Sequence, residues 1–180
     1  MTTVEPIRNL KDIKKVENIL MKQNMRNALF FTIGTNCGLS ISDIVALDVK
    51  DVRGKTHIQI TEKKTGKFKK FPINSKLMPM FKKHTEGKRL DEPLFTSRFQ
   101  NRLDRFSAYR IIKEACAEAG LEEHVGTHTL RKTFGYHFYQ EKKDIALLQT
   151  IFNHSTPTVT LRYIGINQDM IDSNLKSFSL

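Results

Sequence analysis

The chain has 180 residues, of which 39% are hydrophobic, and 30 lysine and arginine residues outnumber 19 acidic residues to give a formal net charge of +11. This length and composition suffice for one folded domain, and the absence of a long uncharged apolar run excludes a transmembrane protein. The first residues lack the apolar block of a secretory signal, so we expect a cytoplasmic protein that does not bind membranes. Cys37 and Cys116 lie in apolar helical patterns and are too few for a disulfide framework, so we expect two reduced core residues.

The excess of positive charge indicates a polyanionic partner. Lysine and arginine bind nucleic acid by displacing the counterions that surround its phosphates. Nucleic acid is therefore the first partner to consider, and a generally basic solvated surface is the alternative. An anionic membrane is disfavoured, because no stretch combines a cationic helix face with exposed apolar anchors.

The residues before the first strand predict three helices. Asn9 can cap the first, and the apolar residues that follow fall on one stripe: Leu10, Ile13, Val16 and Leu20. A second helix is expected from about Asn24 to Gly38, because glycine is common where a helix ends, and it should pack on the first. A short third helix is expected from Ser40 to Leu47, in which Ser40 and Asp43 fit a capping box.

The middle of the chain predicts a β-hairpin. Residues 57–61 (HIQIT) and 68–73 (FKKFPI) alternate between apolar and polar side chains, and KKTGK supplies a turn between them. Lys64 lies in this lysine-rich turn.

The remainder predicts helices separated by short breaks. We expect these helices from Ser75 to Gly87, from a cap at Ser107 to Gly120, from His128 through the HTLR segment, from a cap at Asp144 through IALLQTIF, from Pro157 to Tyr163, and from Gln168 to Leu175. The buried side of the second of these should carry Ile111, Ile112, Ala115, Cys116 and Ala119. The fold class is therefore mainly α with a small antiparallel β-sheet (α+β), in one domain over residues 1–180.

Five polar side chains stand out against this scaffold: Lys64, His128, Arg131, His154 and Tyr163. His128 and Arg131 lie three positions apart, nearly one helical turn, so both leave the same helix face. Taken singly, each of the five has a simpler explanation as a turn residue, a helix end or the edge of a core. Together they provide what a phosphodiester under attack requires: cations for its nonbridging oxygens, a proton donor for the leaving oxygen, and a nucleophile.

The order of four segments resembles the catalytic domain of tyrosine recombinases, the phage integrase family. The segments are GLSISDIVALDVKDV, KKTGKFKKFPI, HTLRKTF and FNHSTPTVTLRY, and the similarity runs from about Asn9 to Tyr163. Its most specific part is HxxR followed by an NHS turn and a tyrosine nine residues after the second histidine. The resemblance implies a domain that cuts and rejoins double-stranded DNA without a metal ion or nucleotide cofactor.

The resemblance also implies a role for each residue. Tyr163 would attack a DNA phosphate to form a 3′-phosphotyrosine, and Arg131 would hold two phosphate oxygens. His128 and His154 would donate hydrogen bonds or assist proton transfer, and Lys64 would protonate the departing 5′ oxygen. A zinc site at the histidines is disfavoured, because no HExxH pattern or sufficient ligand set accompanies them.

One position departs from the family pattern. The family usually has an arginine directly after the Gly-Leu pair of the first segment, where this chain has Ser40. Serine suits a helix start, but a hydroxyl supplies no fixed positive charge, and removing one preorganised donor can cost about 10²–10³ in rate. Arg26 and Arg53 are candidate substitutes whose positions the sequence does not fix.

Length is the second departure. About eight residues precede the first predicted helix, so we expect the catalytic domain alone, without the N-terminal core-binding domain that completes a clamp around DNA in the family. Residues 164–180 carry more apolar side chains than a solvated tail needs. We expect this tail to dock in cis in the free protein and on a neighbouring copy in a homo-oligomer on DNA.

Two functional classes stay open. The first is a site-specific recombinase domain, attenuated by Ser40. The second is a noncatalytic DNA-binding regulator or accessory factor that keeps the recombinase fold. Formation of a covalent protein–DNA complex separates the two, because only the recombinase forms a phosphotyrosine.

Overall fold

The computed structural model describes residues 4–61, 66, 68–121, 125–166, 173 and 175–179. This part of the chain is mainly helical and contains one two-stranded antiparallel sheet, as the sequence predicts. Its elements are α1 (Leu10–Gln23), α2 (Met25–Cys37), α3 (Ile41–Ala46), the 3-10 helix η1 (Val49–Asp51), β1 (His57–Thr61), β2 (Phe68–Pro72), α4 (Leu77–Thr85), α5 (Arg105–Glu118), α6 (Thr129–Lys142), α7 (Ile145–Phe152) and α8 (Pro157–Tyr163).

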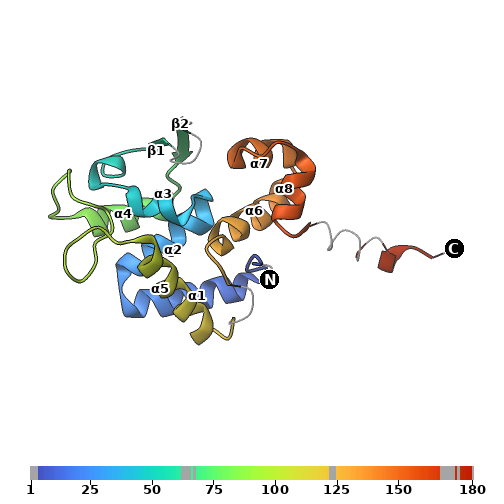
Figure 1. Cartoon of the computed structure of the whole chain (residues 1–180), viewed down its shortest axis with the longest axis horizontal. Helices are drawn as coiled ribbons and strands as arrows, with labels where there is room; N and C mark the ends of the chain where they lie inside the picture. The colour runs from blue at the N-terminus through green and yellow to red at the C-terminus, as the bar shows by residue number, and fades with distance from the viewer. Residues whose placement is uncertain are drawn as a thin grey trace.

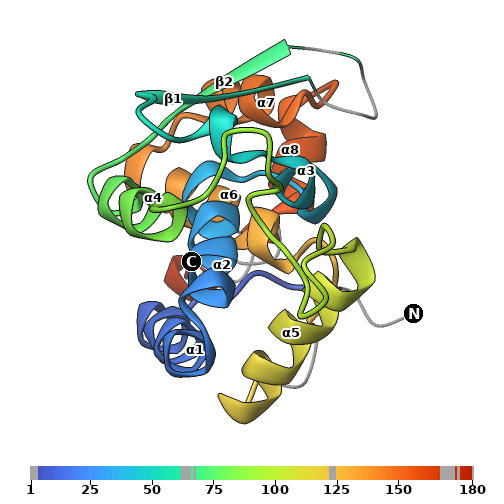
Figure 2. The same cartoon turned by 90° about the vertical axis from the view of Figure 1, so that its left-hand side faces the viewer.

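Helix α2 is the centre of the fold. It packs against α1, α3, α4, α5 and α6, and it runs through the middle of the molecule in two perpendicular views (Figures 1 and 2). Asn24 caps its start by accepting a hydrogen bond from the backbone N–H of Arg26, and Gly38 ends it in the left-handed conformation at φ 65°. Asn9 caps α1 in the same way. These boundaries confirm the first two predicted helices.

The hairpin pairs in a register that buries one face. Ile58 lies opposite Phe71, and both side chains are buried against the main core. Lys69 lies opposite Ile60, on the same side of β2 as Phe71, because alternate residues of a strand share a face. The turn that contains Lys64 lies outside the described residues.

Helices α5 and α4 begin at residues that differ from the predicted ones. Helix α5 starts at Arg105, because the carboxylate of Asp104 accepts hydrogen bonds from the backbone N–H groups of Phe106 and Ser107. Ser107 therefore lies inside the first turn and is not the cap. An ionised carboxylate suits this position, where it accepts two N–H groups at the positive end of the helix dipole.

Helix α4 starts at Leu77, where the side chain of Asn74 accepts the backbone N–H of Leu77 at 2.9 Å, and it ends at Thr85 rather than near Gly87. Asn74 thus provides the side-chain hydrogen bond at this helix start, two residues after the predicted start at Ser75.

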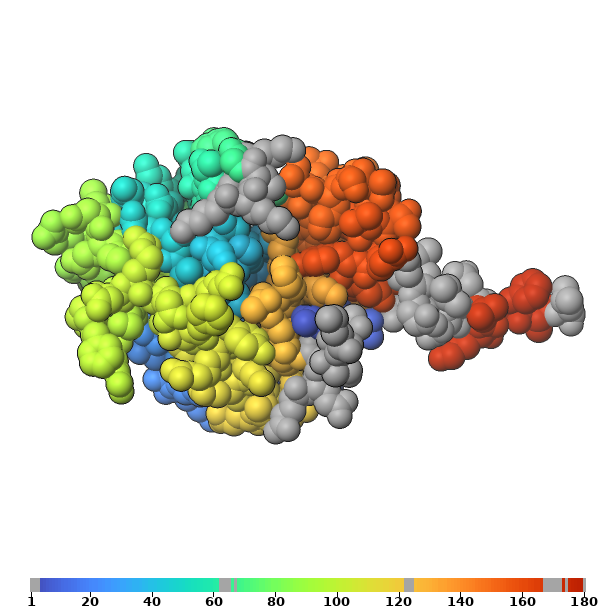
Figure 3. Space-filling model, viewed as in Figure 1, coloured from blue at the N-terminus to red at the C-terminus, as the bar shows by residue number. Residues whose placement is uncertain are grey.

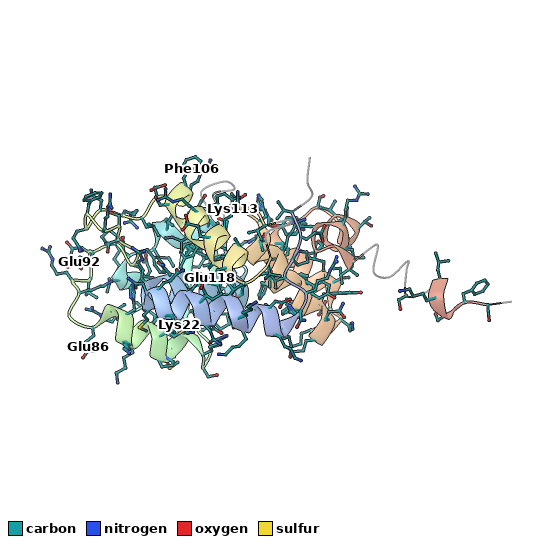
Figure 4. All side chains as sticks on the ribbon, turned by 90° about the horizontal axis from the view of Figure 1, so that it is seen from below. Lys22, Glu86, Glu92, Phe106, Lys113 and Glu118 are labelled. Atoms are coloured by element: carbon teal, nitrogen blue, oxygen red, sulfur yellow. The ribbon has the colours of Figure 1, made fainter. Side chains whose placement is uncertain are left out.

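The core has two parts, and α6 connects them. The larger core surrounds α2 and includes Cys37 and Cys116, which are buried free thiols as predicted. In α5, Ala115 and Cys116 face this core, whereas Lys113 and Glu118 point away from it (Figure 4). The smaller core lies between α6, α7 and α8 and forms the lobe on the right of Figure 1.

The end of the chain only partly follows the prediction. Ile164 and Ile166 are buried in the smaller core, so the chain directly after Tyr163 is anchored. Leu175 and Phe178 are each 67% exposed, and Figure 1 shows their segment apart from the body, so the prediction that they dock in cis is wrong. Most of the helix expected from Gln168 to Leu175 lies outside the described residues. Within the described ranges, no helix has the length and apolarity needed to cross a bilayer.

Candidate active site

The structure brings four of the five predicted residues together where α6, α7 and α8 meet. His128 precedes α6, Arg131 lies in its first turn, His154 follows α7, and Tyr163 ends α8. Lys64 belongs to the undescribed hairpin turn. In Figure 3 the teal hairpin lies beside the orange lobe that carries these residues, and a hydrogen bond from Lys69 to the carbonyl of Ile151 joins the two parts.

Tyr163 is held by its ring and by its hydroxyl. The hydroxyl and Nδ1 of His128 share a hydrogen bond at 3.2 Å. The ring packs edge-on against His154, with centroids 5.0 Å apart, and against Phe152 at 5.5 Å. Helix α8 ends here because Gly165 takes a left-handed conformation at φ 76°. The phenol is therefore fixed at a helix end.

The environment of Tyr163 favours the neutral phenol. Burial raises the pKa of Tyr163 to about 12, while the charge and a hydrogen bond of Arg131 lower it by a smaller amount. Burial disfavours the charged phenolate, so the hydroxyl keeps its proton at neutral pH. A nucleophilic role for this hydroxyl would consequently require a base, and Nδ1 of His128 is within hydrogen-bond distance.

Arg131 connects three parts of the chain. Its guanidinium donates hydrogen bonds to the carbonyl oxygens of Gly38, at 2.5 Å, and Phe152, at 3.1 Å. Its Cζ atom lies 4.4 Å from the centroid of the Phe152 ring. Guanidinium offers five N–H donors in a planar fork, so donors remain for a phosphate beside these carbonyls.

His154 follows a sharp end to α7. Asn153 is left-handed at φ 55°, and the backbone N–H of His154 donates to the carbonyl of Gln149. Nδ1 of His154 lies 3.1 Å from the hydroxyl of Thr160. Burial lowers the pKa of His154, and the nearby charges of Arg131 and Lys69 lower it further. At neutral pH the imidazole is therefore neutral, and it can serve as a hydrogen-bond partner without adding charge.

Ser40 lies at the start of α3, two residues after the carbonyl that Arg131 binds. Its hydroxyl accepts the backbone N–H of Asp43 at 3.2 Å and donates to the Asp43 carboxylate at 2.5 Å. The start of α3 thus lies beside Arg131, and the hydroxyl proton of Ser40 is used within the cap. Neither the Ser40 hydroxyl nor the Asp43 carboxylate contributes a positive charge at this position.

Neither candidate substitute for the missing arginine lies near this place. Arg26 is in the first turn of α2, and its guanidinium bonds to the carbonyl of Thr96 and the side chain of Asn27. Twelve residues of helix separate it from Gly38, which corresponds to about 18 Å. Arg53 donates to the carbonyls of Thr85, at the end of α4, and of Lys88, beyond it. Both arginines are held by backbone carbonyls elsewhere in the fold.

Two lysines near the site were not selected from the sequence. Nζ of Lys132 lies 5.3 Å from the centroid of the Tyr163 ring and donates to the carbonyl of Val4 at 2.6 Å. Lys69 donates to the carbonyl of Ile151 at 2.6 Å, and its charge lowers the pKa of His154. The alternation of FKKFP offered a signal for Lys69, because it places this lysine on the face of buried Phe71.

Residues 7–170 match the model of the phage integrase family. The chain belongs to this family of tyrosine recombinases. The family match covers every element described above and confirms the resemblance found in the four sequence segments.

Individual relatives agree with this membership. A probable integrase/recombinase, YoeC of Bacillus subtilis strain 168, is 49% identical over 179 residues, which cover 99% of this chain and 98% of that protein. A tyrosine recombinase of Pseudothermotoga lettingae is 27% identical over 185 residues, which cover 94% of this chain. This chain spans only 64% of the length of the Pseudothermotoga protein.

Solved structures confirm the fold. The catalytic domain of bacteriophage HP1 integrase superposes with a TM-score of 0.70 at 25% identity, covering 97% of this chain and 95% of that domain. The XerA recombinase superposes with a TM-score of 0.76 at 18% identity, covering 96% of this chain and 66% of XerA. A lambda integrase dimer bound to a COC′ core site gives a TM-score of 0.73 at 15% identity, covering 93% of this chain and 49% of that chain.

Proposed function

We propose that this family member cuts and rejoins duplex DNA through a 3′-phosphotyrosine at Tyr163. The observation that carries the proposal is the hydrogen bond between the Tyr163 hydroxyl and Nδ1 of His128, beside the guanidinium of Arg131. A nucleophile in contact with a base and next to a phosphate-binding cation is the arrangement that phosphoryl transfer requires.

The proposed cleavage forms one bond to phosphorus and breaks another. One proton leaves the attacking oxygen, and one proton reaches the departing oxygen. The Tyr163 oxygen bonds to phosphorus while its proton passes to His128. The bond from phosphorus to the 5′ oxygen breaks, and that oxygen takes a proton from Lys64. Attack by a 5′-hydroxyl on the phosphotyrosine reverses both transfers, so rejoining needs no external energy source.

Binding of the duplex precedes this chemistry. We place the DNA across the face that carries Arg131 and the hairpin lysines, because the chain has a net charge of +11 and Lys69 of the hairpin is bonded to the lobe that holds Arg131. Binding that depends on phosphate contacts weakens steeply with salt. A titration of folded protein with duplex DNA at low salt that gives no association would contradict this assignment.

Covalent trapping tests the proposed function. Since the target sequence is unknown, the substrate is a pool of duplexes with a randomised core, nicked so that a short 5′-hydroxyl fragment diffuses away after cleavage. The parent should form a complex that survives denaturing electrophoresis, and Tyr163→Phe should form none while binding the pool equally well. Binding without any adduct by the parent would instead support the noncatalytic DNA-binding alternative.

The exposed end of the chain supports an assembly on DNA. Leu175 and Phe178 are exposed, although apolar side chains of this size gain by burial. We assign them to docking on a neighbouring copy once two copies occupy one duplex, and the lambda integrase complexes, solved as a dimer on a core site and a tetramer on a Holliday junction, provide a precedent for such assembly.

Truncation after Ile166 tests this role, because it keeps the two buried isoleucines. The truncated protein should remain folded and bind a single half-site, but it should lose cooperative binding to a duplex that holds two. The double substitution Leu175→Ser with Phe178→Ser should act in the same way. Unchanged cooperativity in both variants would contradict the assignment.

A further inference from the structure

We infer that Lys69 is a second phosphate-binding cation of this site and takes the place of the arginine that is absent at Ser40. The inference rests on the proposed function, and it concerns how a pocket with one arginine neutralises a phosphate whose charge grows during attack. It is carried by the position of Lys69 relative to Arg131 and His154.

Strand β2 directs Lys69 toward the site. Lys69 is half-buried, whereas Phe68 and Lys70 on either side of it are exposed. Its face of the hairpin is the one on which Phe71 enters the main core. The lysine is therefore on the inner side of the sheet, and its ammonium reaches the carbonyl of Ile151 in the lobe that carries the reactive residues.

Lys69 and Arg131 bind consecutive carbonyls at the end of α7. Nζ of Lys69 donates to the oxygen of Ile151 at 2.6 Å, and Nη2 of Arg131 donates to the oxygen of Phe152 at 3.1 Å. The C-terminal end of a helix has a partial negative charge and favours cations. Helix α7 thus holds two cations from distant segments next to each other.

The environment of His154 is consistent with the position of these two charges. Both Lys69 and Arg131 disfavour the protonated imidazole, so both positive groups lie close to it. The edge of this imidazole contacts the ring of Tyr163. Lys69 therefore lies near His154, the residue whose ring contacts the proposed nucleophile.

The chemistry of the two side chains allows this role. An ammonium group has three donors, so Lys69 can keep the Ile151 carbonyl and still donate to a phosphate oxygen. With Ser40 committed to Asp43 and His154 neutral, Lys69 adds a positive charge that neither of these groups supplies. A lysine is a point charge without the bidentate fork of arginine, so the replacement is functional but incomplete.

The first test measures adduct formation by bound protein on the nicked duplex pool. Lys69→Met keeps most of the stem but removes the charge, and the rate should fall about 10²-fold, the cost of one preorganised donor. Lys69→Arg should retain most of the activity. Lys22→Met removes an equal charge from α1 (Figure 4) and should leave the rate unchanged.

The second test separates a catalytic charge from a structural tether. In a Ser40→Arg background the arginine should neutralise the phosphate, so Lys69→Met should then cost less than about tenfold. A neutral methylphosphonate in place of the cleaved phosphate should also reduce the rate loss caused by Lys69→Met, because this group lacks the charged nonbridging oxygen that Lys69 would neutralise. If Lys69 only fixed the hairpin, Lys69→Met would lower the rate by the same factor in the parent and in the Ser40→Arg protein. The factor would also be the same on the phosphate and on the methylphosphonate substrate.

The outcomes distinguish the inference from the proposed function. An active parent whose rate is unchanged by Lys69→Met, or equal losses in both backgrounds, would overturn the role of Lys69 alone. A parent that is inactive while Ser40→Arg is active would also overturn it, because Lys69 would then not replace the arginine. If neither protein forms an adduct, the proposed function fails and the inference fails with it.

Discussion

The hydroxyl of Tyr163 and Nδ1 of His128 lie 3.2 Å apart, although 35 residues of chain separate them. The pKa of Tyr163 is raised to about 12 by burial, so only a very small fraction of the phenol is ionised near neutral pH. The contact therefore pairs the proposed nucleophile, which needs deprotonation, with a group that can accept the proton.

This pairing predicts a pH dependence. In His128→Gln, adduct formation should fall about 10²–10⁴-fold near neutral pH, because the proton acceptor is gone. The remaining rate should rise about tenfold per pH unit between about pH 7 and 9, since the phenolate fraction grows tenfold per unit well below the pKa of Tyr163. The parent should depend less steeply on pH. His137→Gln, on the same helix but bonded to the carbonyl of Ile7, is the control and should behave as the parent.

Ser40→Arg should raise covalent-complex formation by at least about tenfold on DNA that both proteins bind equally. The reason is that the start of α3 lies beside Arg131, which bonds to the carbonyl of Gly38. The change also removes a helix cap worth about 1 kcal/mol, so the comparison requires folded protein at equal concentration. Ser42→Arg adds the same charge within α3 and should give no gain. A gain that survives Tyr163→Phe would rule out the proposed cause.

The contact of α2 with α6 predicts a stability effect. A Cβ atom on Gly34 would lie 2.6 Å from Cδ1 and 2.8 Å from Cβ of Leu130, the residue before Arg131. Gly34→Ala should therefore destabilise the fold by about 1–3 kcal/mol through overpacking, measured by denaturant unfolding. It should also slow adduct formation, because α6 carries Arg131. Thr35→Ala, at the next and less buried position, controls for helix propensity. A stable Gly34→Ala protein would show that α6 is free to shift.

Local signals were sufficient for most of the fold. The caps at Asn9 and Asp144 and the helix start near Asn24 depend on the residue and its immediate neighbours, and all three are found in the structure. The start of α5 was misplaced because Asp104 and Ser107 both suit a cap within one turn. The sequence pattern did not decide between them, whereas the structure shows which side chain accepts the backbone N–H groups.

Long-range contacts explain what was missed at the site. The spacing of HxxR and the NHS turn suffices to group His128, Arg131, His154 and Tyr163, because they lie on consecutive helices. Lys69 bonds to this part of the fold at Ile151, 82 residues later, and no local pattern reports that contact. Arg26 and Arg53 were candidates by charge alone, and tertiary packing takes both elsewhere.

Mass spectrometry of the trapped complex tests the central claim most directly. The chain has 4 tyrosines, and trypsin cleaves after Arg162, so a peptide beginning at Tyr163 separates this residue from the other three. After nuclease digestion of the adduct, we predict a nucleotide joined through its 3′-phosphate to Tyr163. A nucleotide on Tyr109, Tyr136 or Tyr139, or one joined through its 5′-phosphate, would contradict the account.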